Sequence, residues 1–271
     1  MSAVGERVVL VTGASSGIGQ SCAALFTQRG YRVYGASRSA VSTSDGVAPL
    51  RMDVTQDDSV RAACDSLLTR EGRLDILINS AGMGIAGAVE DTSPEEAREQ
   101  FEVNFLGVLR VCRAVLPAMR QQGSGYIVNI GSIGGVIAIP YQGLYSASKF
   151  ALEGLTECLR MEVKPFGIRV VLIEPGDHRT GFTENRRVTA GSAENQTYRT
   201  AFTRAIQRMA NDEQAGPAPD RVAELVYGVT QRRNPRLRYT AGSRVQRAAV
   251  WLKRLTPNAL VERIITAYYA R

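Results

Sequence analysis

The chain has 271 residues, 44% of them hydrophobic and 22% charged, which is enough for one large α/β core and does not require a second domain. The four cysteines lie far apart without CxxC spacing, so we expect buried thiols in a reducing compartment and neither disulfides nor a metal site. The net charge of +7 comes largely from basic residues near the C-terminus.

A glycine-rich turn separates the first predicted strand, residues 7–12, from a helix over residues 20–29. No basic, apolar and small-residue signal precedes the strand, which favours a cytoplasmic protein. Glycines at such a turn let the backbone approach a pyrophosphate, whose charge the helix N-terminal amides meet. The GxxxGxG spacing also fits a plain tight turn. We predict a nucleotide loop formed by Gly13, Ser15, Ser16, Gly17, Ile18 and Gly19.

The tip of the second predicted strand, residues 31–36, carries Ser37 and Arg38. An NAD site usually has a carboxylate about 20 residues past the glycines, whereas no acid occurs here between Glu6 and Asp45. A guanidinium beside small hydroxyls suits a 2′-phosphate. The pattern therefore predicts NADP(H), with a solvated surface Arg38 as the alternative.

Two more strands are predicted over residues 49–55 and 74–79, with a helix over residues 56–71 between them. Ser93 then begins a capping sequence with the spacing S-x-x-E, and an apolar stripe continues that helix to Met119. Asn104 lies within it, either as a tolerated polar residue or as a group that holds a water near the cleft.

Between Arg120 and Lys149 lie 28 residues without a formal charge. Their six glycines and Pro140 argue against a membrane span. The remaining interpretations are an ordinary buried strand and loop or a dry cavity, in which electrostatic effects are strong. We favour the cavity.

Within this stretch, a strand over residues 125–131 places Ser132 at its tip. Tyr145 and Lys149 lie four residues apart, on one face of a helix. A nearby ammonium lowers the pKa of a phenol, which could then exchange protons with an alcohol or carbonyl. The three side chains form a candidate proton-transfer site.

A last strand, residues 168–174, ends at Pro175 and Gly176. Buried apolar strands that alternate with helices predict a doubly wound parallel sheet, with ligands at the carboxyl ends of the strands. All the polar motifs above fall at those ends.

Taken together, these motifs resemble the short-chain dehydrogenase/reductase family, in particular its hydroxysteroid and retinol dehydrogenases, over about residues 7–242. The resemblance implies a Rossmann-type fold. Two departures are Ser80, in place of a second asparagine, and Gly131, in place of a small hydroxyl residue. The matching residues are Thr12, Gly13, Gly17, Ile18, Gly19, Asp53, Val54, Asn79, Ala81, Gly82, Asn104, Ser132, Tyr145, Lys149, Pro175, Gly176 and Thr180.

The resemblance also implies roles for these residues. Tyr145 would donate or accept the proton, and Lys149 would lower its pKa and hold the nicotinamide ribose. Ser132 would hold the substrate oxygen, and Asn104 would fix a water in a proton relay. The remaining coenzyme contacts would come from Asp53, Val54, Asn79, Ala81, Gly82, Pro175, Gly176 and Thr180.

Residues 177–219 correspond to the family's substrate lid, which varies with the substrate. His178, the only histidine, is better explained by a loop contact or a solvated position than by catalysis. A lipophilic substrate fits the apolar residues nearby better than a sugar does. The candidates for an apolar pocket are Met83, Ile137, Ile139, Tyr141, Leu144 and Phe182.

The C-terminal extension, residues 243–271, follows a catalytic domain predicted over residues 1–242. No acid occurs between Glu224 and Glu262, and eight bases lie between them, Arg254 included. An apolar helical stripe, including Val245, Leu252 and Leu255 beside Trp251, accompanies the bases. We expect packing over the substrate pocket first, peripheral membrane contact second, and no nucleic-acid binding, because no such motif is present.

The sequence therefore predicts an NADP(H)-dependent oxidoreductase that acts on a lipophilic ketone or aldehyde, or on the corresponding alcohol, as a homodimer or homotetramer. A reductase of small polar carbonyls is one alternative. A dinucleotide-binding sensor or scaffold without turnover is another, although such proteins often lose the tyrosine or the lysine that this chain keeps.

Overall fold

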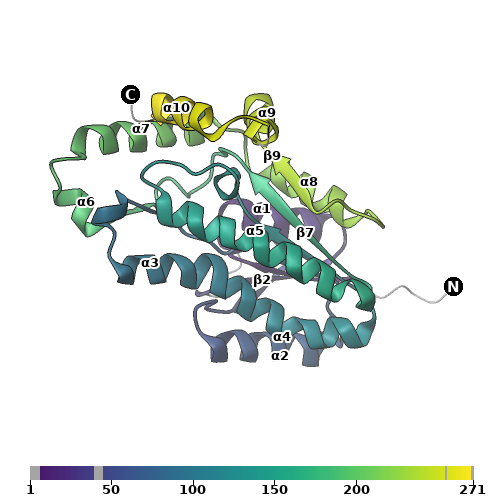
Figure 1. Ribbon diagram of the computed structural model, residues 1–271. Helices are drawn as coiled ribbons and strands as arrows, with labels where there is room; N and C mark the ends of the chain where they lie inside the picture. The colour runs from purple at the N-terminus through teal and green to yellow at the C-terminus, as the bar shows by residue number, and fades with distance from the viewer. Residues whose placement is uncertain (1–6, 40–44, 254, 270–271) are drawn as a thin grey trace.

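A seven-stranded parallel sheet forms the centre of the computed structural model, which describes residues 7–39, 45–253 and 255–269 (Figure 1). Its order is β3-β2-β1-β4-β6-β7-β9, which reverses between β1 and β4 and confirms the predicted doubly wound sheet in a single domain. The predicted base Arg254 lies outside the described residues. The strands are β1 (Val8–Thr12), β2 (Arg32–Ser37), β3 (Val47–Arg51), β4 (Ile76–Asn79), β6 (Gly125–Ile130), β7 (Ile168–Pro175) and β9 (Arg238–Ala241).

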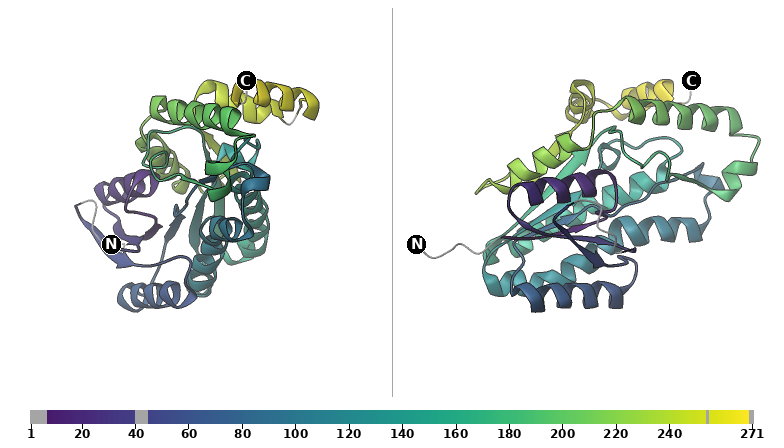
Figure 2. Two further views of the ribbon diagram at one scale, coloured as in Figure 1. Left: turned by 90° about the vertical axis from the view of Figure 1, so that its left-hand side faces the viewer. Right: turned by 180° about the vertical axis from the view of Figure 1, so that it is seen from behind.

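Helices cover both faces of this sheet, so its strands are apolar on both sides. In β1, Val9 and Val11 pack with α1 and α8 on one face of the sheet. The right-hand view of Figure 2 has these two helices in front of the sheet. Val8 and Leu10 pack with α2, α4 and α5 on the other face. The helices are α1 (Gly17–Gln28), α2 (Asp57–Glu71), α4 (Gly107–Gln122), α5 (Gly143–Val163) and α8 (Asp220–Thr230).

The helix predicted to run unbroken from Ser93 to Met119 is interrupted, so that prediction was wrong in detail. The predicted capping box is present at the start of α3 (Pro94–Phe101), where Ser93 accepts from the amide of Glu96. A π-helical turn, Glu102–Leu106, then separates α3 from α4. Such turns often occur at functional sites, and this one carries Asn104.

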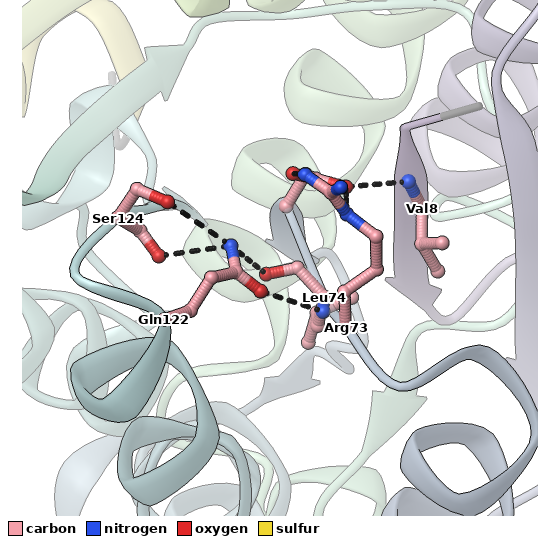
Figure 3. A network of polar contacts seen from close by, with 6 residues as sticks. Val8, Arg73, Leu74, Gln122 and Ser124 are labelled. Carbon is pink, nitrogen blue, oxygen red and sulfur yellow. Dashed lines mark hydrogen bonds and ion pairs between the residues drawn. The ribbon is translucent and has the colours of Figure 1, made fainter. Parts of the chain in front are cut away.

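A network of polar contacts lies at the amino ends of β1 and β4 (Figure 3). This edge of the sheet is opposite the edge that carries the predicted motifs. Asp75 accepts from the amide of Val8 at 2.8 Å and pairs with Arg73 through two hydrogen bonds of 2.9 and 2.6 Å. Beside it, the amide of Gln122 donates to the carbonyl and the hydroxyl of Ser124. The network joins β1 to the segment that begins β4.

The remaining elements lie beyond the carboxyl ends of the strands or in loops. The aromatic ring of Tyr141 packs against Tyr198 and Phe202, which holds the start of α7 near the start of α5. In the C-terminal extension, α10 packs on α7 (Figure 1). These elements are β5 (Ile85–Ala86) paired with β8 (Arg187–Val188), η1 (Val89–Asp91), η3 (Ile133–Gly135), η4 (Lys164–Phe166), α6 (Ala190–Glu194), α7 (Arg199–Ala215), α9 (Arg244–Lys253) and α10 (Asn258–Tyr269).

The apolar stripe that the sequence placed on α9 is exposed. Val245 is 77% exposed, Trp251 62% and Leu255 67%, whereas Val250 supplies the buried contact of this helix. This stripe therefore does not pack over the pocket, although the extension itself reaches the pocket wall through Tyr269 of α10. None of the described helices combines the length and the apolar character that crossing a bilayer requires.

Candidate active site

A cavity of about 1180 Å³ opens at the carboxyl ends of the strands, on both sides of the point where the strand order reverses. This is where an open α/β sheet binds its ligands. The predicted site residues that line it are Gly13, Ser15, Ser16, Gly17, Ile18, Ser37, Arg38, Asp53, Val54, Ala81, Gly82, Ser132, Tyr145, Lys149, Pro175, Gly176 and Thr180.

The glycine turn brings backbone against backbone at one end of the cavity. Gly13 has a φ of +65°, and a Cβ added there would lie 2.7 Å from the Cα of Ala81. A Cβ on Gly19 would lie 2.3 Å from the carbonyl oxygen of Gly13. Ser16, the residue before α1, makes no side-chain cap, so the first amides of this helix can meet an anion. The turn fits a pyrophosphate.

The tip of β2 presents a hydroxyl and a guanidinium to the cavity. The hydroxyl of Ser37 is buried and has no hydrogen-bond partner among the described residues. Arg38 beside it is exposed and lines the same cavity. Just after the neighbouring strand β3, Asp53 accepts from the amide and the hydroxyl of Thr55 at 3.0 and 2.8 Å, which fixes its carboxylate.

Ser132, Tyr145 and Lys149 meet at the other end of the cavity. The hydroxyl of Ser132 accepts from the amide of Gly134 at 3.0 Å and is hydrogen-bonded to the phenol of Tyr145. A Cβ on Gly134 would lie 3.3 Å from both Ser132 Oγ and the Tyr145 ring, so glycine permits this approach. The Nζ of Lys149 lies 5.8 Å from the centroid of the Tyr145 ring and donates to the carbonyl of Ile130 at 2.9 Å.

Burial dominates the electrostatics of the pair. It raises the pKa of Tyr145 to about 12, although the hydrogen bond to Ser132 opposes the shift, and it lowers the pKa of Lys149 to about 8. The lowered phenol pKa expected from the sequence is therefore not found. Desolvation is the largest cause of the shift, and Lys149 donates to a backbone carbonyl rather than to the phenol. The phenol of Tyr145 therefore keeps its proton at neutral pH.

Three predicted site residues lie outside the cavity wall. The amide of Asn79 donates to Asn129 at 2.9 Å, and Gly19 packs against the glycine turn. Asn104 accepts from the amide of Met83 at 2.9 Å and donates to its carbonyl at 3.0 Å and to Ser148 at 3.1 Å. Its side chain therefore holds the loop after β4, and its predicted role in a water relay remains a prediction.

The predicted apolar pocket is correct for half of its residues. Met83, Ile139 and Phe182 line the cavity, and the Phe182 ring centroid lies 5.5 Å from that of Tyr145. The other three, Ile137, Tyr141 and Leu144, do not line it. The sequence could not show that Tyr141 packs against Tyr198 and Phe202 instead.

Among the residues of the cavity wall that the sequence did not indicate are Asp177, Glu213 and Tyr269. Asp177 offered a signal, because an acid directly follows the Pro-Gly pair at a strand end. His178 also lines the cavity, and its Nδ1 lies 3.0 Å from the carbonyl oxygen of Gly176. That bond agrees with the loop contact we expected. Burial lowers the pKa of His178, which favours the neutral ring.

Comparison with known proteins identifies the family. A model of the family described as short chain dehydrogenase matches residues 7–191. The chain belongs to this family. It is therefore an oxidoreductase of a family that binds nicotinamide dinucleotides, and the glycine turn, Ser37 and Arg38 line its cavity.

Several members of the short-chain dehydrogenase family match nearly the whole chain. The 3-ketodihydrosphingosine reductase of Bacteroides thetaiotaomicron is 42% identical over 264 residues, 97% of this chain and 98% of the relative. Human 17-beta-hydroxysteroid dehydrogenase type 1 is 35% identical over 257 residues, 86% of this chain and 77% of the relative. The hydroxysteroid dehydrogenase resemblance is thereby confirmed.

Two solved structures support the same assignment. A short-chain dehydrogenase from Streptomyces avermitilis has a TM-score of 0.82 at 31% identity and covers 98% of this chain and 97% of its own. A short chain dehydrogenase/reductase from Burkholderia phymatum, in complex with NAD, has a TM-score of 0.78 at 26% identity and covers 92% of each chain.

Proposed function

We propose that this short-chain dehydrogenase reduces a lipophilic ketone or aldehyde to the corresponding alcohol with NADPH, and catalyses the reverse reaction with NADP⁺. One observation carries the proposal: the phenol of Tyr145, protonated at neutral pH and hydrogen-bonded to Ser132, faces a cavity wall that includes Phe182. When bound, the coenzyme would supply the hydride for the new C–H bond. Tyr145 gives its proton to the carbonyl oxygen as that bond forms.

The proposed substrate is a long-chain ketone. The Bacteroides relative, identical at 42% of positions, is a 3-ketodihydrosphingosine reductase, so a 3-keto sphingoid base is our first candidate. The apolar side chains of Met83, Ile139 and Phe182 bound the cavity beside Tyr145 and support an alkyl chain there. Each apolar Å² buried contributes about 25 cal/mol, which favours a long chain over a small polar carbonyl.

Replacing Tyr145 by phenylalanine tests the proposed chemistry. Because only the transferable proton is removed, we expect kcat for a long-chain ketone to fall by about 10²-fold or more while NADPH affinity changes little. Single-turnover kinetics and NADPH fluorescence titration measure the two effects. Substantial turnover by Tyr145→Phe would refute the role. A native protein that binds NADPH but reduces no carbonyl in a panel of lipids, sugars and hydroxy acids would instead be a sensor or scaffold.

Coenzyme choice has a test of its own. We expect NADPH to bind at least about tenfold more tightly than NADH, because a charged hydrogen bond to the 2′-phosphate contributes about 1.5 to 3 kcal/mol. Arg38→Ala should narrow that difference, and Arg38→Lys should restore part of it. Equal affinities of the native protein for NADPH and NADH would assign Arg38 to the solvated surface and contradict the preference.

We also propose how the molecule is organised in the cell. Residues 1–242 would form the catalytic domain of a cytoplasmic homodimer or homotetramer, and residues 243–271 would touch an anionic membrane surface. Exposed Trp251 and Leu255 lie beside the exposed bases Arg244 and Arg247, which supports contact with lipid headgroups. Sedimentation equilibrium measures the oligomeric state. A monomer at micromolar concentration would contradict the proposed homodimer or homotetramer.

A further inference from the structure

Asp177 places a carboxylate in the wall of the cavity that holds Tyr145. It directly follows the Pro-Gly pair that ends β7, and its charge is near enough to Tyr145 to raise the pKa of the phenol further. Among residues 7–39, 45–253 and 255–269, no lysine, arginine or histidine forms an ion pair with it. Glu213, another acid of the cavity wall, differs, because it pairs with Arg186 and accepts from Thr183.

A neutral amide holds Asp177 in place. The Nε2 of Gln246 donates to Asp177 Oδ2. Gln246 is itself fixed at the start of α9, where it and Ser243 exchange hydrogen bonds of 3.0 and 3.2 Å. A Cβ on Gly176 would lie 2.3 Å from Gln246 Oε1, and one on Gly242 2.6 Å from it, so two glycines make room for this contact. The carboxylate is thus oriented without being neutralised.

The surroundings of Asp177 favour a cation. Burial raises its pKa to about 6, and the charges of Asp212 and Glu213 add to the shift, while Gln246 and Arg186 oppose it. It therefore remains largely ionised at neutral pH. A partly desolvated carboxylate is stabilised by an opposite charge. Tyr269 lines the same cavity. Burial raises the pKa of its phenol most, and the charge of Asp177 raises it further. An aromatic ring near a carboxylate is suited to an ammonium group.

We propose that Asp177 binds the ammonium group of an amino ketone, with Gln246 as its positioning residue, so that this enzyme selects long-chain ketones bearing an amine near the carbonyl. The proposal rests on the proposed reductase function for its reaction and adds the substrate group that Asp177 recognises. The alkyl chain would lie against the apolar wall, and the carbonyl would face Tyr145.

The first experiment compares kcat/KM, at saturating NADPH, for a long-chain 2-amino-3-ketone and for the same ketone without the amine. The native enzyme should prefer the amino ketone by about tenfold or more, as expected for one charge-assisted contact. Asp177→Asn should abolish most of that preference while its amide oxygen still accepts from Gln246. An unchanged preference in Asp177→Asn, or equal values for both ketones in the native enzyme, would overturn the proposal.

Asp212→Asn is the matched control. Asp212 accepts from Tyr268 at 2.9 Å and pairs with Arg208, and it does not line the cavity. Like Asp177→Asn, this substitution removes one negative charge, but from a side chain that does not line the cavity. It should therefore leave the preference for the amino ketone within about twofold of its native value. A loss as large as that in Asp177→Asn would show that the general negative field selects the amine, which would also overturn the assignment to Asp177.

A binding measurement separates this inference from the proposed function. Dodecylamine and dodecanol are titrated by calorimetry into the full-length protein saturated with NADPH. The amine should bind about tenfold or more tightly in the native protein and no better than the alcohol in Asp177→Asn. Tighter binding of the amine that depends on Asp177, in a protein that reduces no ketone, would support the ammonium site and contradict the proposed reductase function. Equal binding of amine and alcohol, with active ketone reduction, would do the reverse.

Discussion

Lys149 is a buried cation, 6% exposed, whose described hydrogen bond is to a backbone carbonyl. Among the residues that the structure describes, no carboxylate pairs with it. Its charge therefore has to be balanced by the solvent of the cavity or by a ligand. Since desolvation lowers its pKa from 10.5 to about 8, a small rise in pH above neutrality begins to remove a charge that an exposed lysine would keep.

This shift predicts a pH dependence for coenzyme capture. The charged form of Lys149 is complete well below its pKa and is lost as the pH rises through about 8, so kcat/KM for NADPH should fall there. The phenol of Tyr145, with a pKa of about 12, stays protonated over that range and should not cause the fall. Stopped-flow measurement of NADPH binding between about pH 6 and pH 10 reports the midpoint.

Lys149→Met is the control for this profile. The variant should bind NADPH more weakly and without the midpoint near pH 8, because the titrating group is gone. A native profile that stays flat up to the ordinary lysine pKa of about 10.4 would show that Lys149 is not desolvated as the structure indicates.

At the residue scale, the sequence predicted which groups meet but not how they titrate. Tyr145 and Lys149 share a helix face because of their spacing, and Ser132 joins them because strand ends converge at one edge of a parallel sheet. The direction of the Tyr145 pKa shift depends on burial, which no local pattern shows. Asp177 was missed for a related reason, since Gln246, which orients it, is 69 residues away.

At the scale of elements, the interruption between α3 and α4 shows a limit of local pattern. The apolar stripe from α3 into α4 has helical spacing, which predicts one continuous helix. Gln100 and Asn104 instead turn their amides toward the loop after β4, where both donate to the carbonyl of Met83. A contact with a segment some 20 residues earlier selects the π-helical turn, and helical periodicity carries no information about it.

The network of Figure 3 predicts a separation of stability from activity. Asp75→Ala would leave the amide of Val8 and the guanidinium of Arg73 without their acceptor, at a cost of about 1 to 3 kcal/mol in the free energy of unfolding. Because Asp75 lies at the amino ends of the strands and does not line the cavity, kcat should change little. Urea denaturation and initial rates measure the two quantities.

Asp75→Asn serves as the matched variant, since its amide oxygen can still accept from Val8. It should recover part of the lost stability. A fall in kcat as large as the fall in stability, measured well below the denaturation midpoint, would show that this end of the sheet affects the site.

At the scale of the whole molecule, the C-terminal helices have two different sides. The inner side reaches the cavity, since Tyr269 of α10 lines it and Gln246 of α9 contacts Asp177. The outer side exposes Trp251 and Leu255 beside bases. Exposed aromatic and leucine side chains with neighbouring arginines are typical of helices that lie in the headgroup region of an anionic bilayer.

The double variant Trp251→Ala, Leu255→Ser tests this surface. The native protein should sediment with phosphatidylglycerol vesicles, less with phosphatidylcholine vesicles, and less again at high salt. The variant should lose at least about tenfold in vesicle affinity while its turnover of a detergent-solubilised ketone persists. Met161→Ser is the control, because Met161 is also 63% exposed but lies on α5.

Two results would contradict membrane contact. Equal sedimentation of native protein and double variant with the anionic vesicles is one. The other is a native dimer that the double variant dissociates, with no vesicle binding by either protein, which would assign the surface to a second copy of the chain.

The hydrogen bond from Gln246 to Asp177 links α9 to the cavity wall. If this link couples membrane contact to substrate binding, the two affinities must affect each other equally. If lying on a bilayer changes how firmly α9 holds Asp177, the affinity for an amino ketone must change by some factor. Loading the cavity with that ketone must then change the affinity for the bilayer by the same factor. The enzyme would leave the membrane more readily, or less readily, according to whether its cavity is filled.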